Sequence, residues 1–266
     1  MAMDKNGKKK RKLFDIVFLL VAAGVLLISV GKLVYTYWEY RSEDNANKKI
    51  EAAYVTYETE EQTEGQGAEN KYVEYPAIKV DMAALKAANP DTVGWIYWDL
   101  FDVSYPVVQG ADNDAYIRTS FSGEYAKSGT LFLDSGCARD FSDWHSVIYG
   151  HDMKDKSMFG RFKEMHTDVD VNADPYFYFY TENKVYKYKV FAYAIVSPYD
   201  ELYCAINSEQ EYDSFVDRAL AISTFSALEE PDLSDRPRIM SLSTCYQHTK
   251  RTLVEGYLEK VYETVW

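Results

Sequence analysis

From residue 76 onward, short apolar runs alternate with turn residues, a pattern that predicts a mainly β domain. Apolar and polar positions alternate over residues 186–190 and 253–259, as they do in a strand with one buried face. Seven strands are expected, over residues 93–98, 103–109, 129–134, 146–150, 185–197, 238–244 and 252–262. Many short strands with few helices are typical of a barrel or a sandwich.

One longer helix is expected to interrupt these strands. Phe215, Ala219 and Ile222 recur at helical spacing within residues 209–225, and acidic residues occupy the other faces. Such a helix packs its apolar side against the rest of the domain. Further short helices are expected over residues 43–54, 82–88 and 157–165, the second of them capped by Asp81.

Residues 13–38 are expected to form a transmembrane signal-anchor. Residues 16–31 carry no charge, and the apolar pattern resumes beyond Lys32 to end in aromatic residues, which favour the membrane interface. As a helix, the segment would measure roughly 39 Å at about 1.5 Å per residue, enough to cross a bilayer. A cleaved signal peptide is the alternative, with a weak cleavage site at Ser29 and Gly31.

The charge distribution gives this anchor an orientation. Residues 1–12 hold six basic residues and one acidic residue, and the positive-inside rule places such a flank in the cytoplasm. Residues 39–75 are expected to form an acidic linker or stalk, and residues 76–266 an extracellular domain. The predicted location is therefore the cell membrane, with a single pass through the lipid bilayer.

Composition and charge narrow the function classes. The chain is 47% hydrophobic and 16% aromatic, so it is not mainly disordered. The net charge is −13, and the basic flank at the N-terminus leaves the domain strongly acidic, which excludes nucleic acid as a partner. Three cysteines leave at least one thiol unpaired. Cys137 and Cys204 are expected to be inert thiols, with a disulfide between them as the alternative.

Three residues with complementary chemistry are expected at strand ends: Cys245, His151 and Arg251. A thiolate is a nucleophile, an imidazole can protonate a leaving amine, and a guanidinium donates hydrogen bonds without losing its proton. Judged from residue types alone, the alternative of a small buried apolar cysteine is the more common case.

The local sequences resemble those of sortases. Residues 241–245, Ser-Leu-Ser-Thr-Cys, resemble the TLxTC signature of the family with Ser in the first position, and residues 145–159 resemble the block around the catalytic histidine of class B sortases. Residues 89–95 and 129–134 look like framework segments of the same family. The resemblance covers residues 80–262. It implies a sortase-like closed β-barrel of about eight strands, with N-terminal helices and a helix between strands six and seven, preceded by one transmembrane helix.

The resemblance also implies a function, that of a cysteine transpeptidase on a Gram-positive-type cell surface, without cofactor or metal. Such an enzyme cleaves the C-terminal sorting signal of a secreted protein at a Thr carbonyl. The resulting thioacyl enzyme then passes the protein to an amine nucleophile from a peptidoglycan precursor or a pilin. Carried over residue by residue, Cys245 is the nucleophile, His151 the general acid and then base, and Arg251 the ligand of substrate and oxyanion. The positions that line the substrate groove are Asn113, Ile117, Tyr149, Ser243 and Thr244.

Several alternatives stay open. Lys250 adjoins Arg251, and the preference for the arginine rests on its place at the start of the last strand. Asp152 follows His151, and its carboxylate would raise the pKa of the histidine if the two side chains lie close. His248, in the loop after the cysteine, is a rival base. The second function class is a catalytically inactive, surface-anchored barrel that binds a ligand or belongs to a pilus.

Overall fold

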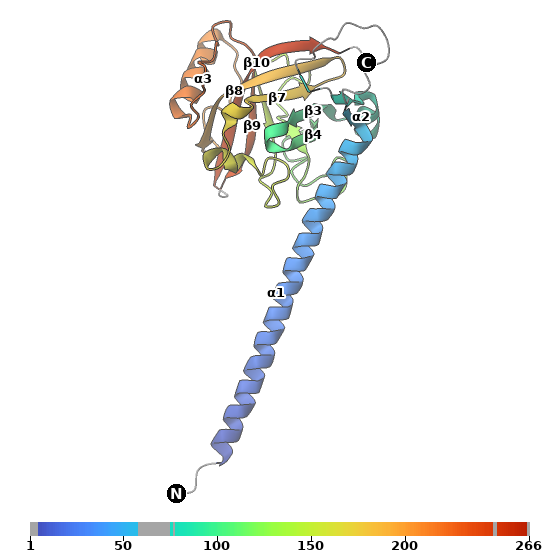
Figure 1. Ribbon diagram of the computed structural model, residues 1–266, viewed down its shortest axis with the longest axis vertical. Helices are drawn as coiled ribbons and strands as arrows, with labels where there is room; N and C mark the ends of the chain where they lie inside the picture. The colour runs from blue at the N-terminus through green and yellow to red at the C-terminus, as the bar shows by residue number, and fades with distance from the viewer. Residues whose placement is uncertain (1–4, 58–74, 77, 247–248, 265–266) are drawn as a thin grey trace. The chain divides into compact units, whose positions relative to one another are not determined.

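The computed structural model describes residues 5–57, 75–76, 78–246 and 249–264 (Figure 1). Contacts divide the chain into two units, Met1–Asn45 and Ala46–Trp266. Most of helix α1 (Lys5–Tyr54) belongs to the first unit, and its large apolar side chains between Leu13 and Trp38 are exposed. The helix is long and apolar enough to cross a membrane, a property that signal sequences near an N-terminus share.

The N-terminal part of the predicted linker is regular structure. Helix α1 continues to Tyr54, which confirms the helix predicted over residues 43–54, and strand β1 (Val55–Tyr57) follows directly. Strand β1 pairs in antiparallel fashion with β2 (Ile78–Val80). Three-residue strands leave little pattern in a sequence, and this pair was not predicted. Residues 58–74 of the predicted linker lie outside the described residues.

Helix α2 (Met82–Ala88) leads into the barrel and agrees with the sequence prediction. The Asp81 side chain accepts a hydrogen bond from the Ala84 N–H at 2.9 Å, which satisfies one of the unpaired donors of the first turn. The Asp81 N–H in turn donates to the Tyr54 carbonyl at 2.8 Å. Leu85 is fully buried, so the short helix is fixed at both its cap and its apolar face.

The other strands close into an eight-stranded barrel, which confirms the predicted fold class. They are β3 (Thr92–Trp98), β4 (Val103–Val108), β5 (Leu131–Leu133), β6 (His145–Tyr149), β7 (Tyr176–Tyr180), β8 (Lys184–Val196), β9 (Ile239–Tyr246) and β10 (Lys250–Glu263). Their order around the barrel is β10-β8-β7-β3-β4-β5-β6-β9. Neighbouring strands are antiparallel except for two parallel pairs, β4 with β5 and β6 with β9. The second parallel pair aligns the C-terminal ends of β6 and β9.

Strand β7 is the barrel strand that the sequence pattern missed. Its residues read Tyr-Phe-Tyr-Phe-Tyr, so no polar position reveals a period of two. The strand lies between β3 and β8, and both Phe177 and Phe179 are fully buried. A strand covered on both faces does not need alternating polarity.

Helix α3 (Glu209–Ile222) lies between the sixth and seventh barrel strands, β8 and β9, as predicted. The Ser208 side chain accepts a hydrogen bond from the Glu211 N–H at 3.2 Å and begins the helix. Phe215 and Ala219 are buried in a cluster that includes side chains of β8, β9 and β10. The helix therefore covers one face of the barrel wall (Figure 1).

The helix predicted over residues 157–165 is wrong in type and extent. The structure has a short 3₁₀ helix, η3 (Phe162–His166), and turns before it. Lys156 and Met158 have φ values of 70° and 54°, and side-chain-bearing residues in this left-handed region cannot continue a right-handed helix. The turns instead place this segment against the strand end that bears the candidate histidine.

Candidate active site

Cys245 and Arg251 face each other on neighbouring strands. Cys245 lies near the end of β9 and Arg251 near the start of β10. The two are Cα partners in the antiparallel pair of these strands, and Lys250 is the partner of Tyr246. Directly opposed side chains point to the same face of a sheet, and neighbours along a strand alternate. Arg251 therefore shares a face with Cys245, whereas Lys250 projects to the other face.

His151 reaches the same level from strand β6. In the parallel pair of β6 and β9, Tyr149 is the partner of Ser243, and the Gly150 N–H donates to the Ser243 carbonyl at 3.0 Å. His151 and Cys245 each come two residues further along the chain. The candidate thiol, imidazole and guanidinium are thus gathered at one end of three adjacent strands.

The His151 ring is held by a backbone carbonyl. Its Nε2 atom lies 2.7 Å from the carbonyl oxygen of Ile117. Because a carbonyl oxygen only accepts hydrogen bonds, Nε2 carries a proton in this arrangement. The His151 carbonyl itself accepts from the Phe159 N–H at 3.1 Å. Ile117, predicted to line the groove, thereby fixes the orientation of the imidazole through its backbone.

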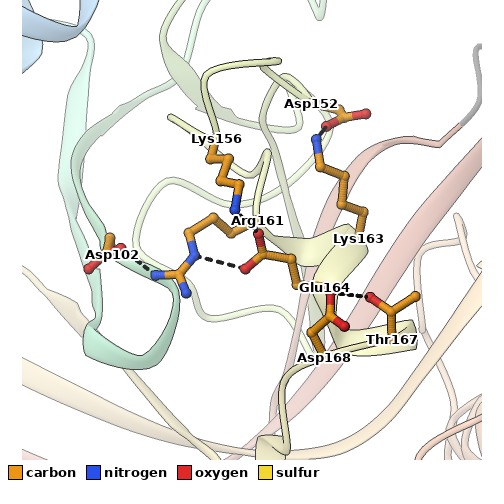
Figure 2. Close-up of polar contacts among 8 residues, drawn as sticks. All are labelled: Asp102, Asp152, Lys156, Arg161, Lys163, Glu164, Thr167 and Asp168. Atoms are coloured by element: carbon orange, nitrogen blue, oxygen red, sulfur yellow. Dashed lines mark hydrogen bonds and ion pairs between the residues drawn. The ribbon is translucent and has the colours of Figure 1, made fainter.

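A network of charged side chains holds the segment after His151 (Figure 2). Glu164 contacts Lys156 Nζ at 2.7 Å and Arg161 Nε at 3.1 Å. The hydrogen bond from Lys156 lowers the pKa of Glu164. Burial raises this pKa, but the hydrogen bond from Arg161 lowers it again, so the pKa stays below its ordinary value. Arg161 also pairs with Asp102, in the turn between β3 and β4. The network therefore ties this segment to another part of the barrel.

Asp152 belongs to an ion pair. The Lys163 Nζ donates to its carboxylate at 3.3 Å (Figure 2). A cation this close offsets much of the field of the carboxylate. That Asp152 raises the pKa of His151 stays a prediction, and the contact with Lys163 weakens the effect to be expected.

Asn113 and Tyr149, both predicted to line the groove, meet at Asp134. The Asn113 amide donates to Asp134 Oδ2 at 2.8 Å, and the Tyr149 hydroxyl donates to the same oxygen at 3.1 Å. Burial, and then the negative charge of Asp134, raise the pKa of Tyr149. Asp134 was not predicted as a site residue, although it follows β5 directly. It fixes two polar side chains beside the strand end of His151.

Ser243 is covered by a tyrosine that the sequence did not single out. Its Oγ atom lies 2.7 Å from the hydroxyl of Tyr203, and the Tyr203 ring stacks on Tyr149 with centroids 6.2 Å apart. Burial raises the pKa of Tyr203 to about 12, against the opposing effects of Ser243 and the Arg251 charge. Tyr203 lies on the connector between β8 and α3, residues 197–208, where no local pattern marks it.

Thr244 differs from the other predicted groove residues. It lies between Ser243 and Cys245 along β9, so its side chain projects to the opposite face. The Thr244 Oγ1 atom is buried there, and neither it nor Oγ1 of its strand partner Thr252 has a hydrogen-bond partner among the residues that the structure describes. A substrate contact by Thr244 therefore requires its backbone.

The other cysteines are unpaired, so the disulfide alternative is wrong. Burial raises the pKa of Cys137 to about 11, which keeps this thiol protonated and a poor nucleophile. His145 is a buried structural residue, and His248 lies outside the described residues. Within the described ranges, no group of three or more His, Cys, Asp or Glu side chains is placed to hold a metal ion.

Comparisons with known proteins match this chain to one family. Residues 96–259 match the model of the sortase domain family. Sortase B of Staphylococcus aureus is 26% identical over 259 residues, covering 96% of this chain and 99% of the relative. Sortase B of Listeria monocytogenes is 25% identical over 227 residues, covering 85% of this chain and 87% of the relative.

The fold agrees as well. Sortase B of Bacillus anthracis, solved in complex with AAEK1, has a TM-score of 0.68 and 24% identity, covering 84% of this chain and all of that one. Clostridium perfringens sortase B has a TM-score of 0.61 and 28% identity, covering 66% of this chain and 99% of that one. With a family match across most of the barrel and relatives that extend over nearly the whole chain, the protein belongs to the sortase family of cysteine transpeptidases.

Proposed function

We propose that this sortase cleaves a C-terminal sorting signal at a Thr carbonyl, using Cys245 as nucleophile, and transfers the new C-terminus to an amine. The observation that carries the proposal is the alignment of Cys245 with Arg251 across β9 and β10, with His151 at the same level of β6. A nucleophile, a proton donor and a charged hydrogen-bond donor on one face meet the requirements of acyl transfer.

In the first step, the Cys245 thiolate attacks the Thr carbonyl carbon and a carbon–sulfur bond forms. The carbonyl oxygen becomes an oxyanion, to which the Arg251 guanidinium donates hydrogen bonds. When the carbon–nitrogen bond breaks, the imidazolium of His151 gives its proton to the leaving amine. The protein then remains joined to Cys245 as a thioester.

In the second step, an amine attacks the thioester. Neutral His151 accepts a proton from the attacking nitrogen as the new amide bond forms. The carbon–sulfur bond breaks and the Cys245 thiolate returns. The amine of this proposal comes from a peptidoglycan precursor or a pilin. The groove residues Asn113 and Tyr149, with the backbone of Ile117, Ser243 and Thr244, hold the peptide during both steps.

The proposal includes a location. Residues 13–38 of α1 anchor the protein in the membrane, with residues 1–12 in the cytoplasm and the barrel outside the cell. The apolar, exposed surface of this part of α1 supports an anchor, and the basic residues before it support the orientation.

Intact-protein mass spectrometry tests the chemistry. Full-length protein in detergent is mixed with a library of peptides that carry a central Thr and a distinct mass on either side. We expect an adduct of the N-terminal fragment on wild-type protein and on Cys204→Ala, and none on Cys245→Ala. Added triglycine should release the adduct as a new amide.

An inactive binding barrel gives a different result. It would bind peptide without any covalent adduct, whatever the residue at position 245. An adduct that persists in Cys245→Ala would move the nucleophile elsewhere and end the proposal in its present form.

A further inference from the structure

A chain of buried polar side chains runs across strands β6, β9 and β10. His145 Nε2 lies 2.7 Å from Ser241 Oγ, which lies 2.5 Å from Glu255 Oε2. At the other side of the ring, His145 Nδ1 lies 2.7 Å from the carbonyl oxygen of Cys204. The exposed fractions of His145, Ser241 and Glu255 are 3%, 0% and 1%. Polar groups this deeply buried satisfy one another, and within the described residues only the second carboxyl oxygen of Glu255, Oε1, is left without a hydrogen-bond partner in this cluster.

The hydrogen positions in this chain follow from its ends. The Cys204 carbonyl only accepts, so His145 Nδ1 carries a proton. If His145 is neutral, Nε2 accepts from the Ser241 hydroxyl. Ser241 then has no hydrogen left for Glu255, so the carboxyl must be protonated and donate to Ser241 Oγ. Every bond of the chain then points the same way, from Glu255 to the Cys204 carbonyl.

The alternative distribution of protons places a charge on both His145 and Glu255. If Glu255 is ionised, Ser241 donates to it, and His145 Nε2 must carry a second proton to satisfy Ser241. This state places an imidazolium and a carboxylate in a fully buried site. Burial disfavours both charges: it lowers the pKa of His145 to about 4 and raises the pKa of Glu255 to about 8. The neutral chain is therefore the state near pH 7.

The surrounding charges favour the neutral carboxyl. Asp200 on the connector acts on Glu255 and raises its pKa further, although Arg218 of α3 pairs with Asp200 at 2.9 Å. Asp134, which follows β5, and Asp143, which precedes β6, raise the pKa of His145 and so oppose the effect of burial. From α3 itself, the neutral ring of Phe215 packs on His145 at 4.6 Å. Other charged groups of this face are Arg251 near the start of β10, and Glu201 and Glu211, whose charges act on the thiol of Cys204.

The chain ends at the connector that covers the candidate site. Cys204 is the neighbour of Tyr203, whose hydroxyl contacts Ser243 and whose ring stacks on Tyr149. Ser241, Ser243 and Cys245 are every second residue of β9, so their side chains lie on one face of the strand. The connector is thus attached to the catalytic face at two points, through Cys204 to the buried chain and through Tyr203 to the site.

We propose that His145, Ser241 and Glu255 are positioning residues, and that the carboxyl proton of Glu255 keeps the connector attached to the catalytic face. When Glu255 loses this proton, Ser241 turns to the carboxylate and His145 Nε2 loses its donor. The hydrogen bond that holds the Cys204 carbonyl then weakens with the rest of the chain. The effect on peptide turnover rests on the proposed function; the effect on the connector does not.

Glu255→Gln separates the proton from the shape of the side chain. A Gln amide donates to Ser241 at every pH, as the protonated carboxyl does. Ser241→Ala removes both bonds of the chain. Glu259→Gln is the matched control. Glu259 also lies on β10, but its carboxylate pairs with Lys187 and does not contact His145, Ser241 or Glu255.

The first measurement is infrared spectroscopy of the full-length protein at pH 7. The difference between wild type and Glu255→Gln should contain the C=O band of a protonated carboxylic acid, and the difference between wild type and Glu259→Gln should not. Absence of this band for Glu255 would overturn the proposed protonation state.

The second measurement is amide hydrogen exchange of residues 200–206 at pH 7 and pH 9, corrected for the intrinsic pH dependence of exchange. Wild type should lose protection by about tenfold at pH 9. This pH is about one unit above the pKa of Glu255, so only about a tenth of the carboxyl remains protonated. Glu255→Gln should keep its protection, and Ser241→Ala should lack it at both values. Equal loss in wild type and Glu255→Gln would overturn the role of the proton.

Turnover supplies the third measurement. Between pH 7 and pH 9, the KM of wild type should rise several-fold relative to that of Glu255→Gln, while the kcat values of the two proteins keep the same ratio. A change confined to kcat would contradict a positioning role through the connector. If no variant turns over peptide but the infrared and exchange results hold, the proposed function fails and the buried chain stands.

Discussion

Arg251 lies directly opposite Cys245 on the antiparallel strands β10 and β9, although Lys250 is its neighbour in sequence. A shift of the strand pairing by one residue would exchange the two cations, because side chains alternate between the faces of a strand. The parallel pairing of β6 with β9 fixes the same face independently, through Tyr149 and Ser243. The position of the guanidinium is therefore set by the register of three strands.

This register predicts different outcomes for two neighbouring substitutions. Arg251→Lys should lower kcat/KM for a sorting peptide by about 10²–10³, the cost of losing one donor to an oxyanion, because an ammonium lacks the paired N–H groups of a guanidinium. Lys250→Ala should stay close to wild type. Steady-state kinetics on both variants provide the check, and the reverse ranking would show that the other face bears the site.

His151 should act as the acid–base group of the reaction. His151→Ala should lose most of its activity, and the wild-type rate should fall on both sides of a pH maximum, because thiolate and imidazolium must be present together. The measurement is kcat/KM between about pH 5 and pH 10. His248→Ala should keep both limbs of the curve; loss of the maximum in that variant alone would assign the role to the loop after Cys245.

The thiols of Cys245 and Cys137 should differ in reactivity. The pKa of Cys137 is raised to about 11 by burial, so only about one molecule in a thousand holds this thiolate at pH 8. We expect iodoacetamide to modify Cys245 well before Cys137, as followed by peptide mass spectrometry. Cys137→Ala should leave the rate of Cys245 labelling unchanged. Preferential labelling of Cys137 would mean that this residue is not buried in solution.

The buried carboxyl of Glu255 predicts a pH-dependent stability. Its pKa is raised to about 8 in the folded state, so folding favours the protonated form and stability falls as the pH rises toward that value. His145, with a pKa lowered to about 4, has the opposite effect at acidic pH, and its contribution is complete above about pH 6.5. The decline due to Glu255 is therefore best measured between pH 6.5 and 8.

Over this interval, wild type should lose roughly 1–2 kcal/mol of unfolding free energy relative to Glu255→Gln, because the slope is about 1.4 kcal/mol per pH unit well below the pKa and half of that at the pKa. Urea titrations at several pH values measure the difference. Glu259→Gln should follow the wild-type slope. Parallel slopes for wild type and Glu255→Gln would show that the carboxyl is already ionised at neutral pH.

The network in Figure 2 predicts a contribution to stability from Glu164, whose side chain is only 13% exposed and contacts two cations. Glu164→Gln should lower the unfolding free energy by about 1–3 kcal/mol, as expected for charge-assisted hydrogen bonds at a partly buried site. Glu182→Gln, which breaks an exposed pair with Lys86, should have little effect. Urea unfolding compares the two; equal effects would mean that burial adds nothing to the Glu164 contacts.

Much of the fold could be predicted because its signals are local. Asp81 and Ser208 cap helices α2 and α3 within three residues of themselves, and most strands show either alternation or flanking turn residues. Strand β7 lacks alternation, since each of its residues is aromatic, although the turn residues Asp174, Pro175 and Asn183 flank it. The turn before η3 depends on positive φ values at Lys156 and Met158. Neither lysine nor methionine favours such values, so the sequence does not predict this turn.

The candidate site also has residues that the sequence predicts and residues that it does not. Cys245, His151 and Arg251 lie in recognisable strings at strand ends, and strand pairing then brings them to one level. Tyr203 reaches Ser243 across 40 residues of sequence, and no pattern within the connector foretells that contact. The replacement of Thr by Ser at position 241 looks conservative in sequence. Only the tertiary structure reveals that its hydroxyl joins His145 to Glu255.

The parallel pairing of β6 with β9 has a consequence for how the protein matures. His145 and Ser241 are 96 residues apart along the chain, and the intervening segment includes β7, β8 and α3. Pairing between such distant segments is slow, because the loop-closure entropy of the intervening chain opposes it. His151 and Cys245 therefore meet only as the barrel closes. Until the barrel closes, Cys245 therefore lacks the imidazole that the proposed acyl transfer requires, and peptide cleavage depends on completed folding.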